Sequence, residues 1–307
     1  MLDVLSFGEP MVEFNQAEPG ARQWLQGFGG DTSNFAIAAA RQGARVGCLG
    51  ALGDDRFGSM IRALWQQEGI DHRAVASDAA AFTAAYFVSH DANGHHFDFI
   101  RRGSAASRVS PASLPLPAIR SARLLHSSGI TLAISASSRE SAFAAMAAAR
   151  QAGRLVSFDT NLRLKLWRLA EARAAIGQAL RCCDIALPSL DDIQALTGLD
   201  DPDALVDHCL QQGAGTVALK LGAAGALVAD HHTRHRIAPF PCSPVDATGA
   251  GDTFGGAFVA RLLAGDGLEG AGRYAACAAA LSTEGFGAVA PIPRAAQVLA
   301  ALARHGG

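Results

Sequence analysis

Short β-rich runs alternate with longer alanine-rich runs along this 307-residue chain, and the alternation restricts the possible folds more than any other feature. Runs such as RLLHSSG and TVALK lack a regular polar alternation and suit strands that are covered on both faces. The pattern predicts an α/β fold, a mostly parallel central sheet flanked by helices on both faces. Strands are expected at residues 3–7, 45–50, 123–128, 154–159, 184–187, 216–220 and 226–229. Helices are expected at residues 32–42, 57–68, 137–151, 169–181, 191–197 and 202–212.

Composition excludes several classes of protein. Half of the residues are hydrophobic, which suits a globular protein with a well-filled core, and the formal net charge of -2 gives no reason to expect a nucleic-acid partner. The six cysteines are scattered without a C-x-x-C pair, so we expect reduced thiols. The start of the chain, MLDVLSFGEP, has no basic leader, and no apolar run reaches the roughly 18 residues that span a membrane. We therefore expect a cytoplasmic protein without a membrane partner.

Residues 83–101 interrupt the α/β rhythm with the sequence TAAYFVSHDANGHHFDFIR. The Asn-Gly pair at 93–94 separates two alternating runs, which is a strong signal for a β-hairpin. With a period of two, Phe97, Phe99 and Arg101 share one face. A hairpin inserted into an α/β chain can be a lid or a dimer edge. An arginine at the end of an aromatic face can hold an anion over a pocket, although by spacing alone a surface charge is the commoner outcome.

A glycine-rich segment, DATGAGDTFGG, occupies residues 246–256. Gly249 and Gly251 permit tight backbone angles and close approach of a ligand. A helix expected over residues 253–263 would direct its free amides and the positive end of its dipole toward that ligand, so the segment predicts an anion site. The segment lacks the lysine and hydroxyl residue of a P-loop, and it lacks the G-x-G-x-x-G spacing of a dinucleotide site.

Asp252 follows the glycines directly, which is unexpected beside a phosphate. An acidic residue in the first turn of a helix is common, because the helix dipole stabilises it. The alternative is that the amides hold a phosphoryl group while Asp252 takes the proton of an attacking hydroxyl. This arrangement of anion site, nucleophile and base is the one that phosphoryl transfer needs.

The stretch DATGAGDTFGGAF resembles the signature of the ribokinase-like (PfkB-type) carbohydrate kinase family. The earlier GFGGDTSNFAIAAARQGARVGCLGALGDDRFG is similar to the N-terminal signature of that family, and the resemblance extends over the whole chain. Four further segments resemble the 2-keto-3-deoxygluconate kinases of the family, namely HDANGHHFDFIRRGSAAS, LLHSSGI, FDTNLRLKLW and GFGAVAPIPR. The resemblance implies one ribokinase-like domain over residues 1–307, with a small β-sheet lid from segments at about 9–30 and 82–103. It also implies a homodimer through the lid.

The activity implied by the resemblance is transfer of the γ-phosphate of ATP to the terminal (6-) hydroxyl of 2-dehydro-3-deoxy-D-gluconate. Asp252 would be the general base, and the amides of Gly249, Ala250 and Gly251 would form the anion hole. The implied sugar-binding residues are Gly30, Asp31, Asn34, Tyr86, Phe99, Arg101, Ile130 and Arg163. The implied nucleotide-binding residues are Asn161, Arg163, Ser189, Lys220, Gly222, Gly225, Gly249, Gly251, Ala276 and Ala279.

Two ion sites are also implied by the resemblance. Ser189 and Asp192 stand as S-x-x-D where many family members carry N-x-x-E, and Asp192 would hold Mg²⁺ through water. Asp246 would contribute to a K⁺ site together with the loop of residues 285–287. Neither site is visible in the sequence without the resemblance.

The substrate remains open between an acid sugar and a neutral sugar such as fructose or ribose. A sugar acid needs a partner for its carboxylate, and a guanidinium binds a carboxylate through two hydrogen bonds. With the resemblance, Arg101 and Arg163 are therefore the expected partners. A nicotinamide-dependent oxidoreductase and a sugar-binding protein without turnover are further alternatives. The missing early dinucleotide fingerprint counts against the former, and the presence of Asp252 counts against the latter.

We expect no functional role for the histidines of two segments. His231, His232 and His235 lie in the segment ADHHTRHRI, where an exposed turn is expected rather than a metal site. His126 lies in an expected buried strand, so we expect a hydrogen-bonded core imidazole there.

Overall fold

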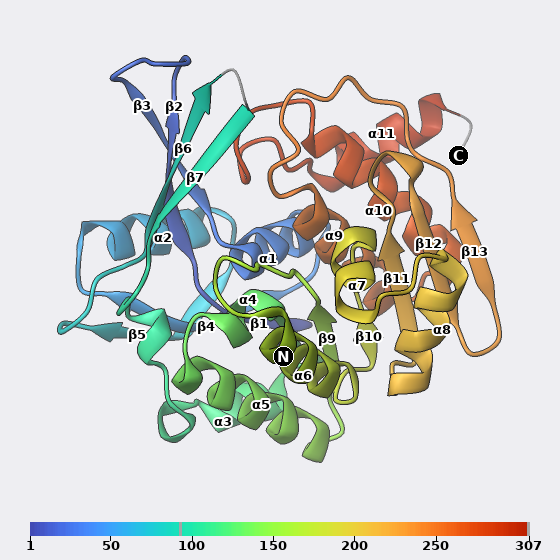
Figure 1. The fold of residues 1–307 in the computed structure, drawn as a ribbon, viewed down its shortest axis with the longest axis horizontal. Helices are drawn as coiled ribbons and strands as arrows, with labels where there is room; N and C mark the ends of the chain where they lie inside the picture. Colours follow the sequence, from blue (N-terminus) through green and yellow to red (C-terminus); the bar gives the residue numbers. More distant parts are fainter. Residues whose placement is uncertain (92–93, 306–307) are drawn as a thin grey trace.

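The computed structural model describes residues 1–91 and 94–305, which form two β-sheets and the helices around them (Figure 1). The strands of the larger sheet are β1 (Val4–Phe7), β4 (Val46–Gly53), β5 (Asp71–Asp78), β8 (Leu124–Ser128), β9 (Leu155–Asp159), β10 (Ile185–Ala186), β11 (Thr216–Lys220), β12 (Ala226–Asp230) and β13 (Arg234–Ile237). Their order is β13-β12-β11-β10-β9-β8-β1-β4-β5. All pairs from β5 to β11 are parallel, and β12 and β13 extend the sheet in the antiparallel sense. The predicted mostly parallel sheet is confirmed.

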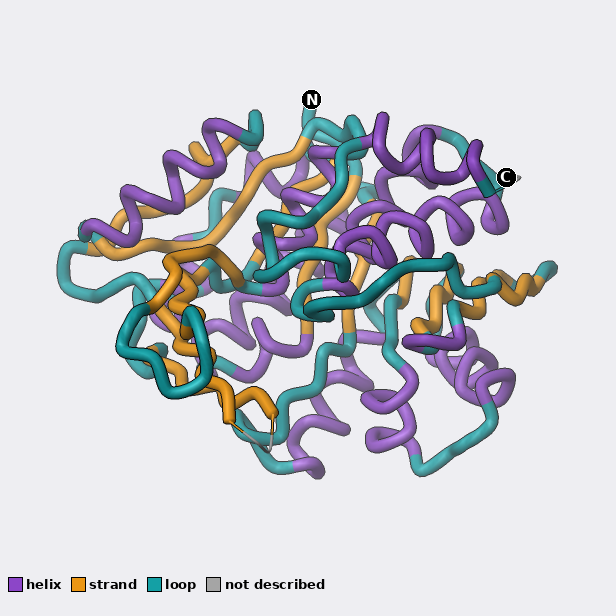
Figure 2. The backbone as a smooth tube through the Cα atoms, turned by 90° about the horizontal axis from the view of Figure 1, so that it is seen from above, coloured by secondary structure: helices purple, strands orange, loops and turns teal. Residues whose placement is uncertain are grey.

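Helices lie on both sides of the larger sheet, as its apolar strands predict (Figure 2). A core that includes Leu125, Met146 and Ile176 lies on one face, and a core that includes Phe35, Val228 and Phe258 lies on the other. The first core involves α3 (Leu116–Ser121), α4 (Gly129–Ala133), α5 (Ala136–Gln151), α6 (Leu169–Leu180), α7 (Leu190–Thr197) and α8 (Pro202–Gln212). The second involves α1 (Asp31–Arg41), α2 (Arg56–Gln67), α9 (Ala250–Ala264), α10 (Leu268–Ser282) and α11 (Ala295–Arg304).

Local side-chain chemistry explains why α7 and α8 lie where the sequence predicts them. The Asp201 carboxylate accepts a hydrogen bond from the Ala204 amide at 3.0 Å and caps α8, while Pro202 occupies the first helical turn. Gly198 ends α7 with φ 79°, in the left-handed region that favours glycine.

Other boundaries differ from the prediction. Helix α9 begins at Ala250 rather than at residue 253, because Gly249 already turns the chain into the helix. The strand expected at 184–187 is shortened to two residues, and the strand expected at 45–50 continues to Gly53. Strands β5 and β13 were not expected, because they lie at the sheet edges and carry exposed polar residues instead of a continuous apolar run. Helices α3, α4, α10 and α11 were also outside the expected set.

The second, small sheet has the order β3-β2-β6-β7 and projects from one end of the larger sheet (Figure 1). Its strands are β2 (Met11–Gln16), β3 (Trp24–Gly29), β6 (Ala85–Asp91) and β7 (Gly94–Ile100). Strands β6 and β7 pair in the antiparallel sense, while residues 92–93 of the predicted turn lie outside the described residues. The Phe97 and Phe99 rings stack with centroids 6.3 Å apart, and the Arg101 guanidinium lies 5.5 Å from the Phe99 ring. The predicted shared face is therefore confirmed.

His126, His231 and His232 lie as the sequence predicts, whereas His235 lies half-buried in strand β13 and not in an exposed turn. His231 and His232 are exposed in the turn of the β12–β13 hairpin, and His126 is buried with its Nδ1 atom 2.9 Å from Ser157 Oγ. Within residues 1–91 and 94–305, no group of three or more His, Cys, Asp or Glu side chains is arranged to hold a metal ion. No helix in the same described ranges is long and apolar enough to cross a membrane.

Candidate active site

The glycine-rich segment forms the turn into α9. Gly249 has φ 76°, and a Cβ atom there would lie 2.9 Å from a neighbouring carbonyl oxygen, so the turn requires glycine. The amides of Gly249, Gly251 and Asp252 have no hydrogen-bond acceptor in the described part of the chain. Of the three amides expected in the anion hole, only that of Ala250 is engaged, because it donates to the Ala247 carbonyl at 3.1 Å. Free amides at the start of this 15-residue helix have the geometry of an anion site.

Close packing of α1 against α9 brings Asn34 to Asp252. A Cβ atom at Gly256 would lie 2.4 Å from the Phe35 carbonyl oxygen and 2.8 Å from Ala38 Cβ, so only glycine permits this approach. At this separation, Asn34 Nδ2 donates a hydrogen bond to Asp252 Oδ2 at 2.8 Å. The expected sugar-binding amide and the expected base are therefore in direct contact.

Two buried oxygens beside Asp252 have no hydrogen-bond partner among the described residues, namely Asp31 Oδ1 and Asn34 Oδ1. Asp31 is held from its other side, where Asn161 Nδ2 donates to Asp31 Oδ2 at 3.1 Å. Asn161 has φ 27° and is the one non-glycine residue with positive φ in the described chain. Backbone strain of this kind concentrates at binding sites, and buried unpaired oxygens are rare in folded proteins. Hydroxyl groups of a ligand would satisfy both oxygens.

The Asp252 carboxyl has an unusually high proton affinity. Burial is the main cause, and together with the neighbouring charge of Asp31 it raises the pKa of Asp252 from 3.8 to about 8. The Asn34 hydrogen bond and the charge of Lys220 act in the opposite direction. A carboxylate that binds a proton tightly is suited to take the proton of an alcohol during a reaction.

Lys220 lies at the end of β11 and forms an ion pair with Asp159 at the end of β9, with Nζ 2.5 Å from Oδ2. Parallel strands place their carboxyl ends at one edge of the sheet, which explains how residues far apart in the sequence meet. Burial raises the pKa of Asp159, while the charge of Lys220 opposes this rise. The family resemblance implied a nucleotide-binding role for Lys220, whereas Asp159 was not predicted.

The expected magnesium residues lie on the same edge. Ser189 is the residue before α7, and Asp192 lies in the first turn of that helix. Asp192 Oδ2 accepts a hydrogen bond from the Leu162 amide at 3.0 Å and lies 3.4 Å from Thr160 Oγ1. The carboxylate thus orders the loop that follows β9 and contains Asn161.

Asp246, the expected potassium residue, connects two loops. Its Oδ1 atom accepts hydrogen bonds from the Thr248 amide at 2.9 Å and the Thr248 hydroxyl at 2.6 Å. Its Oδ2 atom accepts a hydrogen bond from the Gly287 amide at 2.9 Å. The turn that precedes α9 is therefore tied to the loop of residues 285–287.

Arg101 meets a residue that the sequence did not single out, Glu9. Arg101 Nη2 and Nε lie 2.5 Å and 2.8 Å from Glu9 Oε2, and Ser104 Oγ donates to Glu9 Oε1 at 2.5 Å. The Glu9 side chain is fully buried, and burial raises its pKa against the effect of Arg101. The negative charge of Asp31 also raises the pKa of Glu9, and the Glu9 carbonyl oxygen lies against Gly30 at the expected sugar site. The sequence feature that could have indicated Glu9 is its position as an acidic residue inside the apolar run SFGEPMV.

Tyr86 also contacts a buried carboxyl group that the sequence did not single out. Its hydroxyl donates a hydrogen bond to Glu13 on the neighbouring strand β2. Burial raises the pKa of Tyr86, and the charges of Glu13 and Asp252 raise it further. Glu13 was not predicted either.

The other expected residues lie at the periphery. Phe99 is 42% exposed, and Arg163 is exposed with Nη1 donating to the Leu162 carbonyl at 2.8 Å. Ile130 lies half-buried in α4. The remaining positions are Gly30, which caps α1, Gly222 and Gly225 in the β11–β12 turn, and Ala276 and Ala279 on α10.

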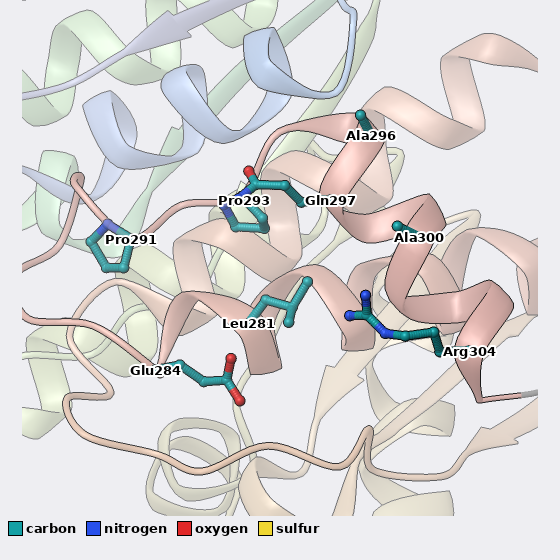
Figure 3. Close-up of a pocket in the computed structure, with 8 residues that line it drawn as sticks. All are labelled: Leu281, Glu284, Pro291, Pro293, Ala296, Gln297, Ala300 and Arg304. Atoms are coloured by element: carbon teal, nitrogen blue, oxygen red, sulfur yellow. The ribbon is translucent and has the colours of Figure 1, made fainter.

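A pocket of about 470 Å³ lies between the end of α10, the following loop and α11 (Figure 3). Its lining includes Leu281, Glu284, Pro293 and Arg304. None of the site residues expected from the sequence contributes to this lining. The pocket is therefore separate from the cluster around Asp252.

Comparison with known proteins places the chain in a family. Residues 1–295 match the sequence profile of the pfkB family carbohydrate kinases. This chain belongs to that family.

Two curated relatives have different substrates in their names. A 2-dehydro-3-deoxygluconokinase from Thermoproteus tenax is 35% identical, over 97% of this chain and 94% of the relative. Fructokinase-2 from Solanum habrochaites is 33% identical, over 97% of this chain and 95% of the relative. The similar identities support a sugar kinase without separating the two substrates.

Solved structures agree with the fold. A fructokinase from Xylella fastidiosa with bound ATP has a TM-score of 0.92 and 25% identity, covering 100% of both chains. A fructokinase from Vibrio cholerae with fructose, ADP and a calcium ion has a TM-score of 0.88 and 29% identity, covering 97% of this chain and 98% of that chain. These likenesses confirm the expected ribokinase-like fold.

Proposed function

We propose that this chain is a 2-dehydro-3-deoxygluconokinase, which transfers the γ-phosphate of ATP to the 6-hydroxyl of 2-dehydro-3-deoxy-D-gluconate. The position of Asp252 carries the proposal. Its carboxyl lies in the first turn of α9, beside free amides, and accepts a hydrogen bond from Asn34. A base, an anion site and a sugar-side amide are thus within reach of one another. The 35% identical relative of that name supports the choice of sugar.

In the proposed reaction, Asp252 takes the proton of the 6-hydroxyl while the hydroxyl oxygen bonds to the γ-phosphorus. The bond from that phosphorus to the β-phosphate oxygen breaks, and its electron pair stays on ADP. The amides of Gly249 and Gly251 stabilise the charge on the transferred group. Asp31 and Asn34 hold the sugar hydroxyls through their unpaired oxygens.

ATP, Mg²⁺ and K⁺ are the proposed cosubstrate and ions. Mg²⁺ supplies neutralisation of phosphate charge when it is bound. Asp192 would hold Mg²⁺ through water, and Asp246 with the loop of residues 285–287 would hold K⁺. The carboxylate oxygens of both residues fit hard cations. The ATP-bound and ADP-bound fructokinases support a nucleotide site in this fold.

The substrate carboxylate would meet Arg163 and Arg101. Arg163 is exposed, so its guanidinium is accessible to a substrate. A neutral sugar such as fructose is the second candidate, and one observation favours it. Glu9 already neutralises the charge of Arg101, so this arginine offers a sugar acid less attraction than a free guanidinium would.

A comparison of kcat/KM on 2-keto-3-deoxygluconate and fructose tests the choice of substrate. We expect the wild type to prefer the keto acid. The change Arg163→Gln should lower kcat/KM on the acid by roughly 10- to 100-fold, because a hydrogen-bonded charge contributes about 1.5–3 kcal/mol, and should leave fructose nearly unaffected. Arg168→Gln, which removes an exposed arginine nearby, is the matched control. If the wild type prefers fructose, the proposed substrate is the neutral sugar and not the acid.

The organisation of the molecule belongs to the same proposal. Residues 1–307 form one domain in which the small sheet, from segments at about 9–30 and 82–103, acts as a lid. Leu25 and Ile100 on this sheet are 62% and 54% exposed, and a homodimer would cover them. Light scattering during gel filtration should report twice the chain mass, and a single chain mass would remove the dimer from the proposal.

A further inference from the structure

The side chain of Lys220 lies beside Gly251 of the anion site. A Cβ atom built on Gly251 would lie 3.6 Å from Lys220 Nζ and 3.8 Å from Lys220 Cδ. The ammonium group is therefore close to the free amide of Gly251 while it is paired with Asp159. The lysine side chain is 12% exposed, so it is enclosed by the site rather than extended into solvent.

The choice of residue at position 220 is itself informative. Of the 26 basic residues in the chain, two are lysines, Lys165 and Lys220. Arginine thus supplies nearly all the positive charge, yet the basic residue at the anion site is a lysine. An ammonium on a flexible four-carbon stem can move between oxygen atoms, whereas a guanidinium is a larger planar fork.

Asp159 is held in place without the help of Lys220. Its Oδ1 atom accepts a hydrogen bond from the Asn161 amide at 3.2 Å, and the residue is 4% exposed. The ion pair uses the other oxygen, Oδ2. Lys220 can therefore leave Asp159 without leaving that carboxylate free to move.

We propose that Lys220 is a catalytic residue whose ammonium moves from Asp159 to the phosphoryl group that is being transferred. Asp159 is then the resting counter-ion, and Lys220 acts where a P-loop lysine acts, although it comes from a different strand. The inference rests on the proposed kinase function and adds a residue to its chemistry.

The charges around the site explain why such a cation is needed. Asp31, Asp159 and Asp252 interact electrostatically with one another, so a phosphoryl group at the start of α9 would meet repulsion from carboxylates. As the bond between the γ-phosphorus and the β-phosphate oxygen breaks, its electron pair goes to ADP and negative charge moves onto that oxygen. The Lys220 ammonium neutralises the negative charge on the oxygens of the transferred phosphoryl group without giving up its proton.

The alternative is that Lys220 only neutralises Asp159 in the folded protein. Two variants and their combination separate the possibilities, namely Lys220→Met, Asp159→Asn and the double variant. Lys165→Met, which removes the other, exposed lysine, is the matched control. The measurements are the melting temperature of the free protein, kcat and KM with ATP, and the dissociation constants of ADP and of a non-hydrolysable ATP analogue.

We expect Lys220→Met to lower kcat by roughly 100- to 1,000-fold, which is the effect of removing one donor from a transition state. Lys220→Met should also weaken binding of the ATP analogue more than binding of ADP. The double variant should regain the melting temperature, because no charge is left unpaired, but not kcat.

Recovery of both melting temperature and kcat in the double variant would overturn the inference and leave Lys220 a structural residue. The inference would also be overturned if the wild type and Lys220→Met bind the analogue equally and their kcat values agree within threefold. The kinase function would then still stand. A wild type that binds neither nucleotide would overturn the kinase function, and the inference with it.

Discussion

Replacing Asp252 with asparagine should stabilise the protein while it abolishes catalysis. The folded protein binds the Asp252 proton more tightly than the unfolded chain, because burial and the charge of Asp31 raise the pKa of Asp252 from 3.8 to about 8. Ionisation of this carboxyl therefore destabilises the fold. The destabilisation is absent below about pH 4, grows between pH 4 and 8, and is complete above about pH 8. Asparagine removes it and can still accept the hydrogen bond from Asn34 Nδ2.

The size of the effect follows from the same shift. At about 1.4 kcal/mol for each tenfold change in proton affinity, the rise from 3.8 to about 8 sets an upper limit of about 6 kcal/mol. Asp252 is only partly shielded from solvent, and water stabilises its ionised form. We therefore expect about 1–3 kcal/mol for the free energy of unfolding at pH 8.5, and less at pH 5.

Urea unfolding of the wild type and Asp252→Asn at pH 5 and pH 8.5 measures this difference. Asp54→Asn is the control, because Asp54 is exposed and no such effect is expected there. A variant that is less stable than the wild type at pH 8.5, or a difference that is the same at both pH values, would show that ionised Asp252 does not destabilise the fold.

Three further predictions concern the same site. Gly256→Ala should lower the free energy of unfolding by about 1–3 kcal/mol in urea titrations, because its Cβ atom would lie 2.4 Å from a carbonyl oxygen of α1, whereas Gly270→Ala on open α10 should be neutral or stabilising. The value of kcat/KM should rise with pH and level off near the raised pKa of Asp252, about 8, and a profile that levels off near pH 4 would contradict the assignment. Glu9→Gln should lower the free energy of unfolding by about 3–5 kcal/mol, because it leaves the Arg101 guanidinium without a counter-ion, and a melting temperature equal to that of the wild type would contradict this.

Local sequence signals were sufficient for the parts of the fold that local chemistry determines. Helix α8 occupies residues 202–212 as predicted, because Asp201 and Pro202 mark its start within the sequence itself. The anion site was predictable for the same reason, since Gly249 and Gly251 precede an apolar helix. Edge strands such as β5 carry mixed polar residues, and their pairing partner rather than their own pattern makes them strands.

The partners inside the site depend on the strand order and were harder to predict. Asp159 meets Lys220 because β9 and β11 both end at the same edge of the sheet. Glu9 meets Arg101 because the small sheet folds back onto the end of β1, across 92 positions of the chain. A sequence pattern reports the character of a segment but not its distant neighbours, so these buried carboxylates were seen only in the structure.

The initial rate of ADP formation with ATP, Mg²⁺ and 2-keto-3-deoxygluconate, compared between the wild type and Asp252→Asn, tests the central claim most directly. We expect turnover by the wild type. We expect a loss of roughly 100-fold or more in kcat for the variant with little change in KM, because the variant binds the sugar but cannot take its proton. A variant that keeps kcat within tenfold of the wild type would contradict the role of Asp252 as the base.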